Sequence, residues 1–236
     1  AMWRKLVGTS EPAPVEWKYE DLKSPTTADE MREVIQSEYE LRKKWMEGTK
    51  EDGWTFFQEV EGIMVEELAL PESSIHVVKA TGKITGINLP EMIASFANGG
   101  LEERQRVNAD IIDHKKVFTV EGDDELYVSY SAFSTPMGVS DREFLTLRNV
   151  YREEDGNVVI VAQSINLESV PFRADRVRGT IRNGRIFKPL EKEGEYQVIL
   201  VDHVDPRGKV PGFVVNMFKK KAAEAILKIQ KNYGKQ

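Results

Sequence analysis

Cysteine is absent from the 236 residues of this chain. Its absence excludes disulfide bonds, thiolate metal sites and a cysteine nucleophile. A chain without disulfides suits a reducing compartment, and the sequence shows no signal-peptide pattern, so we expect a cytoplasmic protein. Hydrophobic runs are short as well, and none approaches the roughly 20 residues that a transmembrane helix needs.

Histidine is scarce, which limits the metal and acid–base chemistry open to this chain. His76, His114 and His203 are its three histidines, and neither a Gly-x-Ser-x-Gly elbow nor a His-Glu-x-x-His helix is present. Zinc needs three or four ligands, and no suitable residues cluster at the right spacing. Asp113-His114 and Asp202-His203 invite a catalytic interpretation, but histidines of ordinary strands or turns are the simpler one. We therefore expect no metal, no cofactor and no histidine-based active site.

The sequence also lacks an excess of positive charge. It has 33 Lys and Arg residues against 39 Asp and Glu residues, a net charge of −6, so we expect no nucleic-acid partner. Gly99-Gly100 is not followed by Lys-Ser or Lys-Thr, so no phosphate-binding loop of that kind is present. The basic run at 219–221 is most simply a solvated helix face, and contact with an anionic membrane is the alternative.

What the chain does contain is a long alternation of predicted helices and strands. Residues 1–26 include three prolines and are expected to form an irregular lead-in, whereas 27–236 contain no linker-like stretch and are predicted to form one domain. Thr27 and Glu30 have the spacing of a capping box, which predicts a helix that ends at Gly48.

Predicted strands dominate the middle of the chain. Asn183-Gly184 is a strong hairpin pattern, because both residues tolerate positive φ. The other expected turns lie at Gly122, Asp155-Gly156 and Glu193-Gly194. We expect strands at 54–61, 63–70 and 74–87, short helices at 89–97 and 101–107, and about six strands between 114 and 204.

The last stretch, 210–233, predicts one long helix. Pro211 suits the first helical position, and about 23 residues at 1.5 Å each give a rod of roughly 34 Å. From periodicity alone, packing on a solid core is the simpler interpretation, and a lid over an apolar ligand cavity is the alternative. The apolar positions that recur at three- and four-residue steps are Val214, Phe218, Ala222, Ala225 and Ile229.

Polar side chains occur where the strands of a solid core would carry methyl groups. Alternation does not show which face of each strand points inward. A buried unpaired guanidinium is very costly, so Arg148 pointing to solvent is the simpler interpretation of these residues alone. The residues that share a face are Tyr127, Ser129 and Ser131 in one strand, Thr146 and Arg148 in the next, and Ala162 and Ser164 in the one after.

Three short motifs occur in a fixed order along the chain. They are Ser140-Asp141-Arg142-Glu143-Phe144, then Val170-Pro171 with Val177-Arg178, then Asp205-Pro206-Arg207-Gly208-Lys209-Val210-Pro211 before a helix with Asn216. In this order they resemble the steroidogenic-acute-regulatory-protein-related lipid transfer domain, the START family, over roughly residues 30–233. The family usually has Arg-Asp-Phe in the first motif and Trp-Asp at 107–108, where this chain has Arg-Glu-Phe and Val-Asn.

The resemblance implies an α+β, helix-grip fold, in which a curved antiparallel sheet of about nine strands surrounds the C-terminal helix and leaves an internal apolar cavity. Sterol-binding members often pair an arginine matching Arg148 with an acid at the position of Ser129. That acid is missing here, which leaves Arg148 to meet an anionic or hydroxylated head group. The expected cavity residues are Tyr127, Ser129, Ser131, Thr146, Arg148, Ala162, Ser164, Val214, Phe218, Ala222 and Ala225.

The same resemblance implies a non-enzymatic monomer that binds one lipid, a phospholipid, sterol or sphingolipid, and transfers it between membranes through transient contact with their surfaces. A lipid-sensing module of a larger protein is one alternative. A cyclase-like enzyme on a related fold is another, with Tyr127 and Arg148 as its acid–base residues. Gly208 and Gly212 act either as a hinge or as turn residues. The expected gate or membrane contacts are Met137, Val170, Phe172, Gly208, Pro211 and Gly212.

Overall fold

The computed structural model describes residues 22–135, 138–208 and 212–234, with the backbone alone for 212–218. Helix α1, Ala28–Glu47, begins at the predicted capping box. The backbone N–H of Glu30 donates to Thr27 Oγ1 at 3.2 Å, and that of Thr27 donates to Glu30 Oε2 at 3.3 Å. These bonds satisfy backbone donors that have no partner inside the first turn, which is why the helix begins here.

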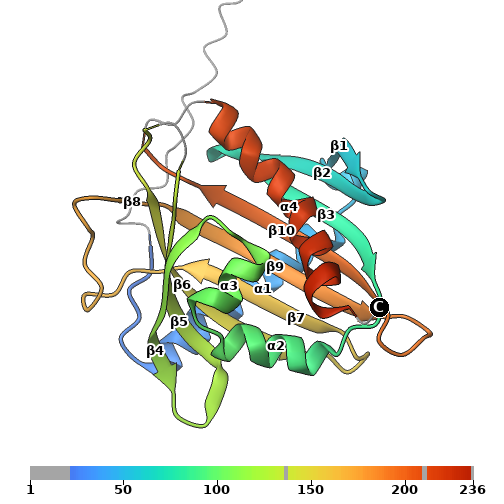
Figure 1. The fold of residues 1–236 in the computed structure, drawn as a ribbon, viewed down its shortest axis with the longest axis horizontal. Helices are drawn as coiled ribbons and strands as arrows, with labels where there is room; N and C mark the ends of the chain where they lie inside the picture. The colour runs from blue at the N-terminus through green and yellow to red at the C-terminus, as the bar shows by residue number, and fades with distance from the viewer. Residues whose placement is uncertain (1–21, 136–137, 209–211, 235–236) are drawn as a thin grey trace, which may run out of the picture.

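An open antiparallel sheet forms the body of the protein, in the order β1-β2-β3-β10-β9-β7-β6-β5-β4, with the short β8 parallel to β6 (Figure 1). Its nine antiparallel strands confirm the predicted α+β sheet of about nine strands. The strands are β1 Thr55–Val60, β2 Ile63–Leu70, β3 Ser73–Ile84, β4 Ile111–Val120, β5 Asp123–Phe133, β6 Arg142–Arg152, β7 Val158–Ser164, β8 Val177–Arg178, β9 Thr180–Pro189 and β10 Tyr196–Asp205.

The hairpin predicted at Asn183-Gly184 is wrong, because both residues lie inside β9. Asn183 pairs with Asp202 of β10, and Gly184 pairs with Val201. A Cβ atom on Gly184 would lie 3.0 Å from the Cβ of Arg42 in α1. Glycine at this position therefore allows a helix to approach the strand closely, which is a use of glycine that the local sequence does not distinguish from a turn.

Helices cover both faces of the sheet and divide the core in two. On the outer face, α1 packs over β7, β9 and β10; its buried Met31, Ile35 and Trp45 join alternate strand residues such as Val161 and Val201. The inner face is the opposite one. It faces α2 (Leu89–Asn98), α3 (Leu101–Val107) and α4 (Gly212–Tyr233), as Figure 1 shows; the 3₁₀ turn Lys50–Asp52 completes the elements.

Helix α4 confirms the predicted long terminal helix and packs on β2, β3 and β10. Ala222, Ala223, Ile226 and Ile229 are buried in the inner core. The side-chain amide of Gln230 bonds both the N–H and the C=O of Thr85, at 2.7 and 3.0 Å, and holds the end of the helix against the chain after β3. Met137 and Pro211, and the side chains of Val214 and Phe218, lie outside the described residues. No helix in the described part of the chain is long and apolar enough to span a membrane.

Candidate functional site

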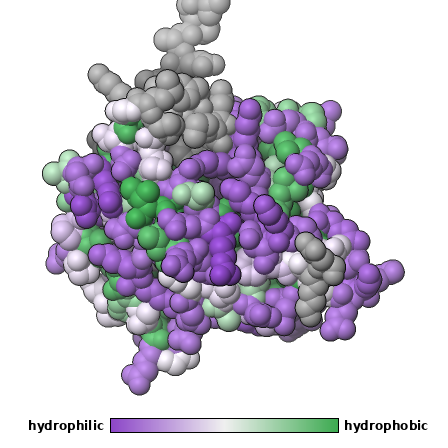
Figure 2. Space-filling view, in the orientation of Figure 1, coloured by the Kyte–Doolittle hydropathy of each residue, from purple (hydrophilic) through white to green (hydrophobic). Residues whose placement is uncertain are grey.

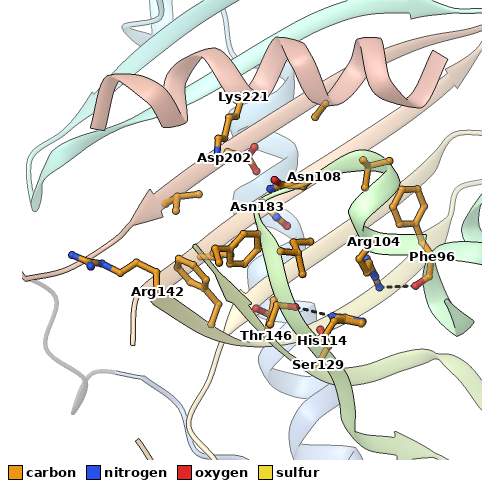
Figure 3. Close-up of a pocket in the computed structure, with 18 of the residues that line it drawn as sticks. Phe96, Arg104, Asn108, His114, Ser129, Arg142, Thr146, Asn183, Asp202 and Lys221 are labelled. Carbon is orange, nitrogen blue, oxygen red and sulfur yellow. Dashed lines mark hydrogen bonds between the residues drawn. The ribbon is translucent and has the colours of Figure 1, made fainter. Parts of the chain in front are cut away.

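A cavity of about 220 Å³ lies between the inner face of the sheet and α4, bounded at one end by α2 and α3. Figure 3 shows Arg142 near one end and Phe96 with Arg104 near the other. Side chains from eight helices and strands line it: Phe96, Arg104, Val107, Asn108, Ile111, His114, Ser129, Ser131, Phe133, Ser134, Thr135, Arg142, Phe144, Thr146, Arg148, Ile181, Asn183, Arg185, Asp202, Val204, Lys221, Glu224, Ala225, Lys228 and Ile229.

Five of the candidate residues line this cavity, namely Ser129, Ser131, Thr146, Arg148 and Ala225. Arg148 therefore points inward, and the simpler interpretation that placed it in solvent is wrong. The faces that alternation grouped together in β5 and β6 are the inner faces of those strands.

The other described candidates are buried outside the lining. Tyr127 is 1% exposed and its hydroxyl accepts a hydrogen bond from Arg104 Nη2 at 3.1 Å. Ser164 accepts one from the backbone N–H of Ile181 at 2.8 Å. Ala162 and Ala222 are also buried. Ala162 lies between Arg148 and Asn183 in the strand register, so its small side chain leaves room between them.

The lining carries more charge than the sequence predicts for a lipid cavity. Arg104, Arg185 and Asp202 were not among the candidates. Asn183 and Arg185 were hidden by the hairpin predicted at Asn183-Gly184. Once β9 is continuous, period-two alternation places Ile181, Asn183 and Arg185 on one face.

Three arginines of the lining, Arg104, Arg148 and Arg185, lie close enough to influence one another electrostatically. Arg104 donates to the C=O of Phe96 at 2.5 Å and to the hydroxyl of Tyr127. Burial lowers the pKa of Arg104, and the charge of Arg148 lowers it further. Burial likewise lowers the pKa of Arg185 to about 10, although Asp202 opposes the shift. The pKa of Tyr127 is raised by burial but falls on balance, because Arg148 and Arg104 favour the phenolate.

Asp202 is the lining carboxylate that interacts with Arg185 and Arg148, and it belongs to the same row of the sheet as Arg148. The register runs from Arg148 through Ala162 and Asn183 to Asp202. Burial raises the pKa of Asp202, while Arg185, Arg148 and the amide of Asn183 lower it in part. Its charge is therefore costly to bury and only partly compensated.

His114 lines the cavity beside Ser131, its neighbour across the β4–β5 ladder, with Nδ1 2.8 Å from Ser131 Oγ (Figure 3). Burial, followed by the charges of Arg104 and Arg148, lowers the pKa of His114 to about 4. The imidazole is thus neutral at pH 7 and adds no charge to the site. Within the described residues, no three His, Asp or Glu side chains are placed to hold a metal ion.

The three motifs found in the sequence meet at one place in the structure. Arg142 Nε donates to the C=O of Pro206 at 2.7 Å and its Nη2 to the C=O of Arg207 at 3.0 Å, so the first motif holds the turn that precedes α4. Glu143 forms a buried ion pair with Arg178, with Oε1 and Nε 2.7 Å apart. Arg178 in turn donates to the C=O of Pro171 at 3.2 Å.

A family model, the START domain, matches residues 26–233. This chain belongs to the START family. Comparison with curated protein sequences gives no significant match. The START chain is similar in fold to human StAR-related lipid transfer protein 5, with a TM-score of 0.74 and 21% identity over 87% of this chain and 97% of that one. Human STARD10 has a TM-score of 0.66 and 18% identity over 90% of this chain and 86% of its own. A StAR-related lipid transfer protein from Xanthomonas axonopodis has a TM-score of 0.64 and 17% identity over 76% of this chain and 98% of its own.

The rim of the START cavity is held by contacts between α4 and the α3 region. Lys221 Nζ lies 2.6 Å from Asp110 Oδ2, and Asn232 donates to the C=O of Arg106 at 3.1 Å. Tyr233 also donates to Glu103. Glu224 lines the cavity and is exposed, so the cavity opens toward solvent beside α4.

The described gate candidates lie around the motif network. Phe172 is 56% exposed and its ring lies 4.9 Å from the Arg178 guanidinium, whereas Val170 is half-buried. Gly208 has a φ of 68°, a turn conformation that glycine adopts without strain. Gly212 is the first residue of α4.

Proposed function

We propose that this START domain binds one lipid molecule in the cavity beneath α4 and transfers it between membranes without chemical change. The observation that carries the proposal is a partly enclosed cavity between α4 and the inner face of a START sheet. The similar structures named above, two of them called lipid transfer proteins, support it. The chain then acts as a monomeric carrier that touches membrane surfaces transiently.

The size of the cavity implies that α4 moves when lipid enters. Its volume of about 220 Å³ lies below the roughly 300–1,000 Å³ usual for ligand pockets. Each buried CH₂ group is worth about 0.8 kcal/mol, so a sixteen-carbon tail gains on the order of 10 kcal/mol before ordering costs. A partly exposed ion pair such as Lys221–Asp110 is worth about 1 kcal/mol at most. Burial of the tail therefore outweighs the loss of the rim contacts.

Docking onto a membrane is assigned to the loop that carries Val170 and Phe172, with Gly208 and Gly212 at the hinge of α4. Figure 2 shows that the face over α2, α3 and α4 is mostly hydrophilic, with hydrophobic side chains in small separate patches. Such a surface favours brief contact over stable insertion, because little apolar area is available to enter the bilayer. Replacement of Phe172 by Asp is expected to slow transfer while lipid binding remains.

The test combines lipid identification with a transfer assay. Native mass spectrometry of the protein from its own source, followed by lipid extraction, is expected to show one bound lipid per chain. Ala225→Trp fills the cavity from α4 and is expected to abolish both binding and vesicle-to-vesicle transfer. Ala94→Trp, on the exposed side of α2, is the matched control and should transfer as the wild type does.

Three results would count against the proposal. Equal transfer by Ala225→Trp and Ala94→Trp would place the lipid elsewhere. Slow exchange of a tightly bound lipid would favour the sensing module. Chemical conversion of the bound lipid would favour an enzyme.

A further inference from the structure

We propose that the lipid of this cavity is an acidic amphiphile, whose ionised oxyacid head lies between the guanidinium groups of Arg148 and Arg185. This inference rests on the proposed function and names the chemical class of its ligand. It begins from charge. Arg104, Arg148 and Arg185 line the cavity, and the carboxylate of Asp202 lies near enough to Arg185 and Arg148 to interact with both.

Two of these arginines have no close hydrogen-bonded partner in the described part of the chain, although Asp202 lies near enough to interact with both electrostatically. Among the described residues, neither Arg148 nor Arg185 donates a hydrogen bond or forms an ion pair within 4.0 Å, and Arg148 Nε is buried without a partner. Arg104, by contrast, donates hydrogen bonds to the C=O of Phe96 and the hydroxyl of Tyr127. A cation held partly out of water without a hydrogen-bonded partner is costly, and an anion in the cavity would offset that cost for both groups at once.

The strand register brings the two guanidinium groups toward a common point. Arg148 of β6 pairs with Ala162 of β7, which pairs with Asn183 of β9, two residues before Arg185. Neighbouring strands are about 4.8 Å apart, so the β6 and β9 backbones lie about 10 Å apart with the small Ala162 between them. Two long side chains on either side of that gap leave space for a carboxylate or a phosphate, which guanidinium groups bind with charge-assisted hydrogen bonds.

Neighbouring groups complete a head-group site and leave room for a tail. The hydroxyls of Ser129 and Thr146 and the amide of Asn183 line the same region. Apolar contact for a hydrocarbon chain comes from Phe133, Phe144, Ile181, Val204, Val107 and Ile229. A quaternary ammonium head would be repelled by the positive charges of Arg148 and Arg185, and an alcohol head would leave both charges without a counter-ion from the ligand.

The cavity should therefore discriminate between heads that share one tail. The probes are palmitic acid, hexadecyl phosphate, hexadecanol and hexadecyltrimethylammonium, each measured by competition against a bound fluorescent lipid. We expect both anionic probes to bind at least about tenfold more tightly than hexadecanol, because charged hydrogen bonds exceed neutral ones by that margin. Whichever anion binds more tightly distinguishes a carboxylate head from a phosphate head.

Two variants are expected to change palmitate affinity in opposite directions. Arg185→Met should weaken palmitate binding at least about tenfold and leave hexadecanol within about twofold. Asp202→Asn should tighten palmitate binding, because it removes the competing carboxylate. Lys188→Met, which removes a charge from the other face of β9, is the matched control and should change neither affinity. Arg185→Lys keeps the charge and should restore part of the loss, provided thermal unfolding shows each variant folded.

The outcomes separate the two proposals. Binding of no probe would overturn the proposed function itself. Equal binding of palmitate and hexadecanol, or equal weakening of both by Arg185→Met, would overturn the acidic ligand and leave lipid binding intact.

Discussion

The buried ion pair between Glu143 and Arg178 is expected to be the most sensitive polar contact in this protein. Glu143 is fully buried and Arg178 is 4% exposed, with Nε and Oε1 2.7 Å apart. The hydroxyl of Tyr130 donates to the second carboxylate oxygen at 2.7 Å. Glu143→Gln keeps the shape of the side chain and removes its charge, so the buried Arg178 loses the carboxylate that its Nε contacts.

The expected loss can be set from this geometry. Removal of one partner of a buried ion pair costs about 3–5 kcal/mol. For a chain of this size, 1 kcal/mol shifts Tm by about 2–4 °C, so Glu143→Gln should lower Tm by about 6–20 °C. Calorimetry and urea unfolding of wild type and variant measure both quantities. The pair joins two of the START motifs, so the same variant tests whether those motifs serve stability.

The matched control is Glu125→Gln, which breaks an ion pair with Arg152 at 2.5 Å on the surface. The side chains of that pair are 30% and 55% exposed, so we expect a loss of about 1 kcal/mol at most. A double replacement, Glu143→Met with Arg178→Met, removes both charges and should recover most of the stability. A loss below about 1 kcal/mol for Glu143→Gln, or a double variant no better than the single one, would refute the reasoning.

Two further predictions concern pH and the cavity rim. Burial lowers the pKa of His203 to about 4, whereas the unfolded chain keeps the ordinary value of 6.5. As pH falls from 7 to 5, this histidine takes up a proton in the unfolded chain but not in the folded one, which lowers the free energy of unfolding. His203→Gln removes this effect, so its free energy of unfolding should fall by roughly 2 kcal/mol less than that of wild type over the same range, as urea unfolding measures. Asp110→Asn removes the ion pair with Lys221 at the rim. It should speed lipid exchange by up to about fivefold in a vesicle transfer assay, with Asp29→Asn on α1 as the control.

One outcome would contradict each of these two predictions. An unchanged pH slope in His203→Gln would mean that this histidine takes up its proton in the folded state. Equal exchange rates for Asp110→Asn and Asp29→Asn would mean that the Lys221 contact does not restrain α4.

Much of the architecture could be predicted because it depends on contacts close in sequence. Thr27 and Glu30 lie three residues apart and begin α1 through their own hydrogen bonds. The periodicity of 210–233 predicted α4, and the two short helices lie where their local patterns placed them. The order of the START motifs predicted the fold that the family model and the similar structures show.

The prediction was wrong where one local pattern has two physical explanations. Asn183-Gly184 suits a turn, but its glycine instead lets α1 approach β9, and Arg42 belongs to a segment far away in the sequence. The strand pattern alone likewise left the direction of Arg148 open, and only the family resemblance placed this residue in the cavity, which it lines. Alternation is symmetric between the two faces of a strand, so only the elements packed on each face distinguish inside from outside.

The sequence by itself determined the helices with their caps, the family and the residues that share a face, because each depends on local spacing or on an ordered set of motifs. Only the tertiary structure decided which charges meet in the cavity. Arg104, Arg148, Arg185 and Asp202 come from α3, β6, β9 and β10. Their proximity, and therefore the electrostatics of the site, arises from strand order and register, which no single segment of the chain contains.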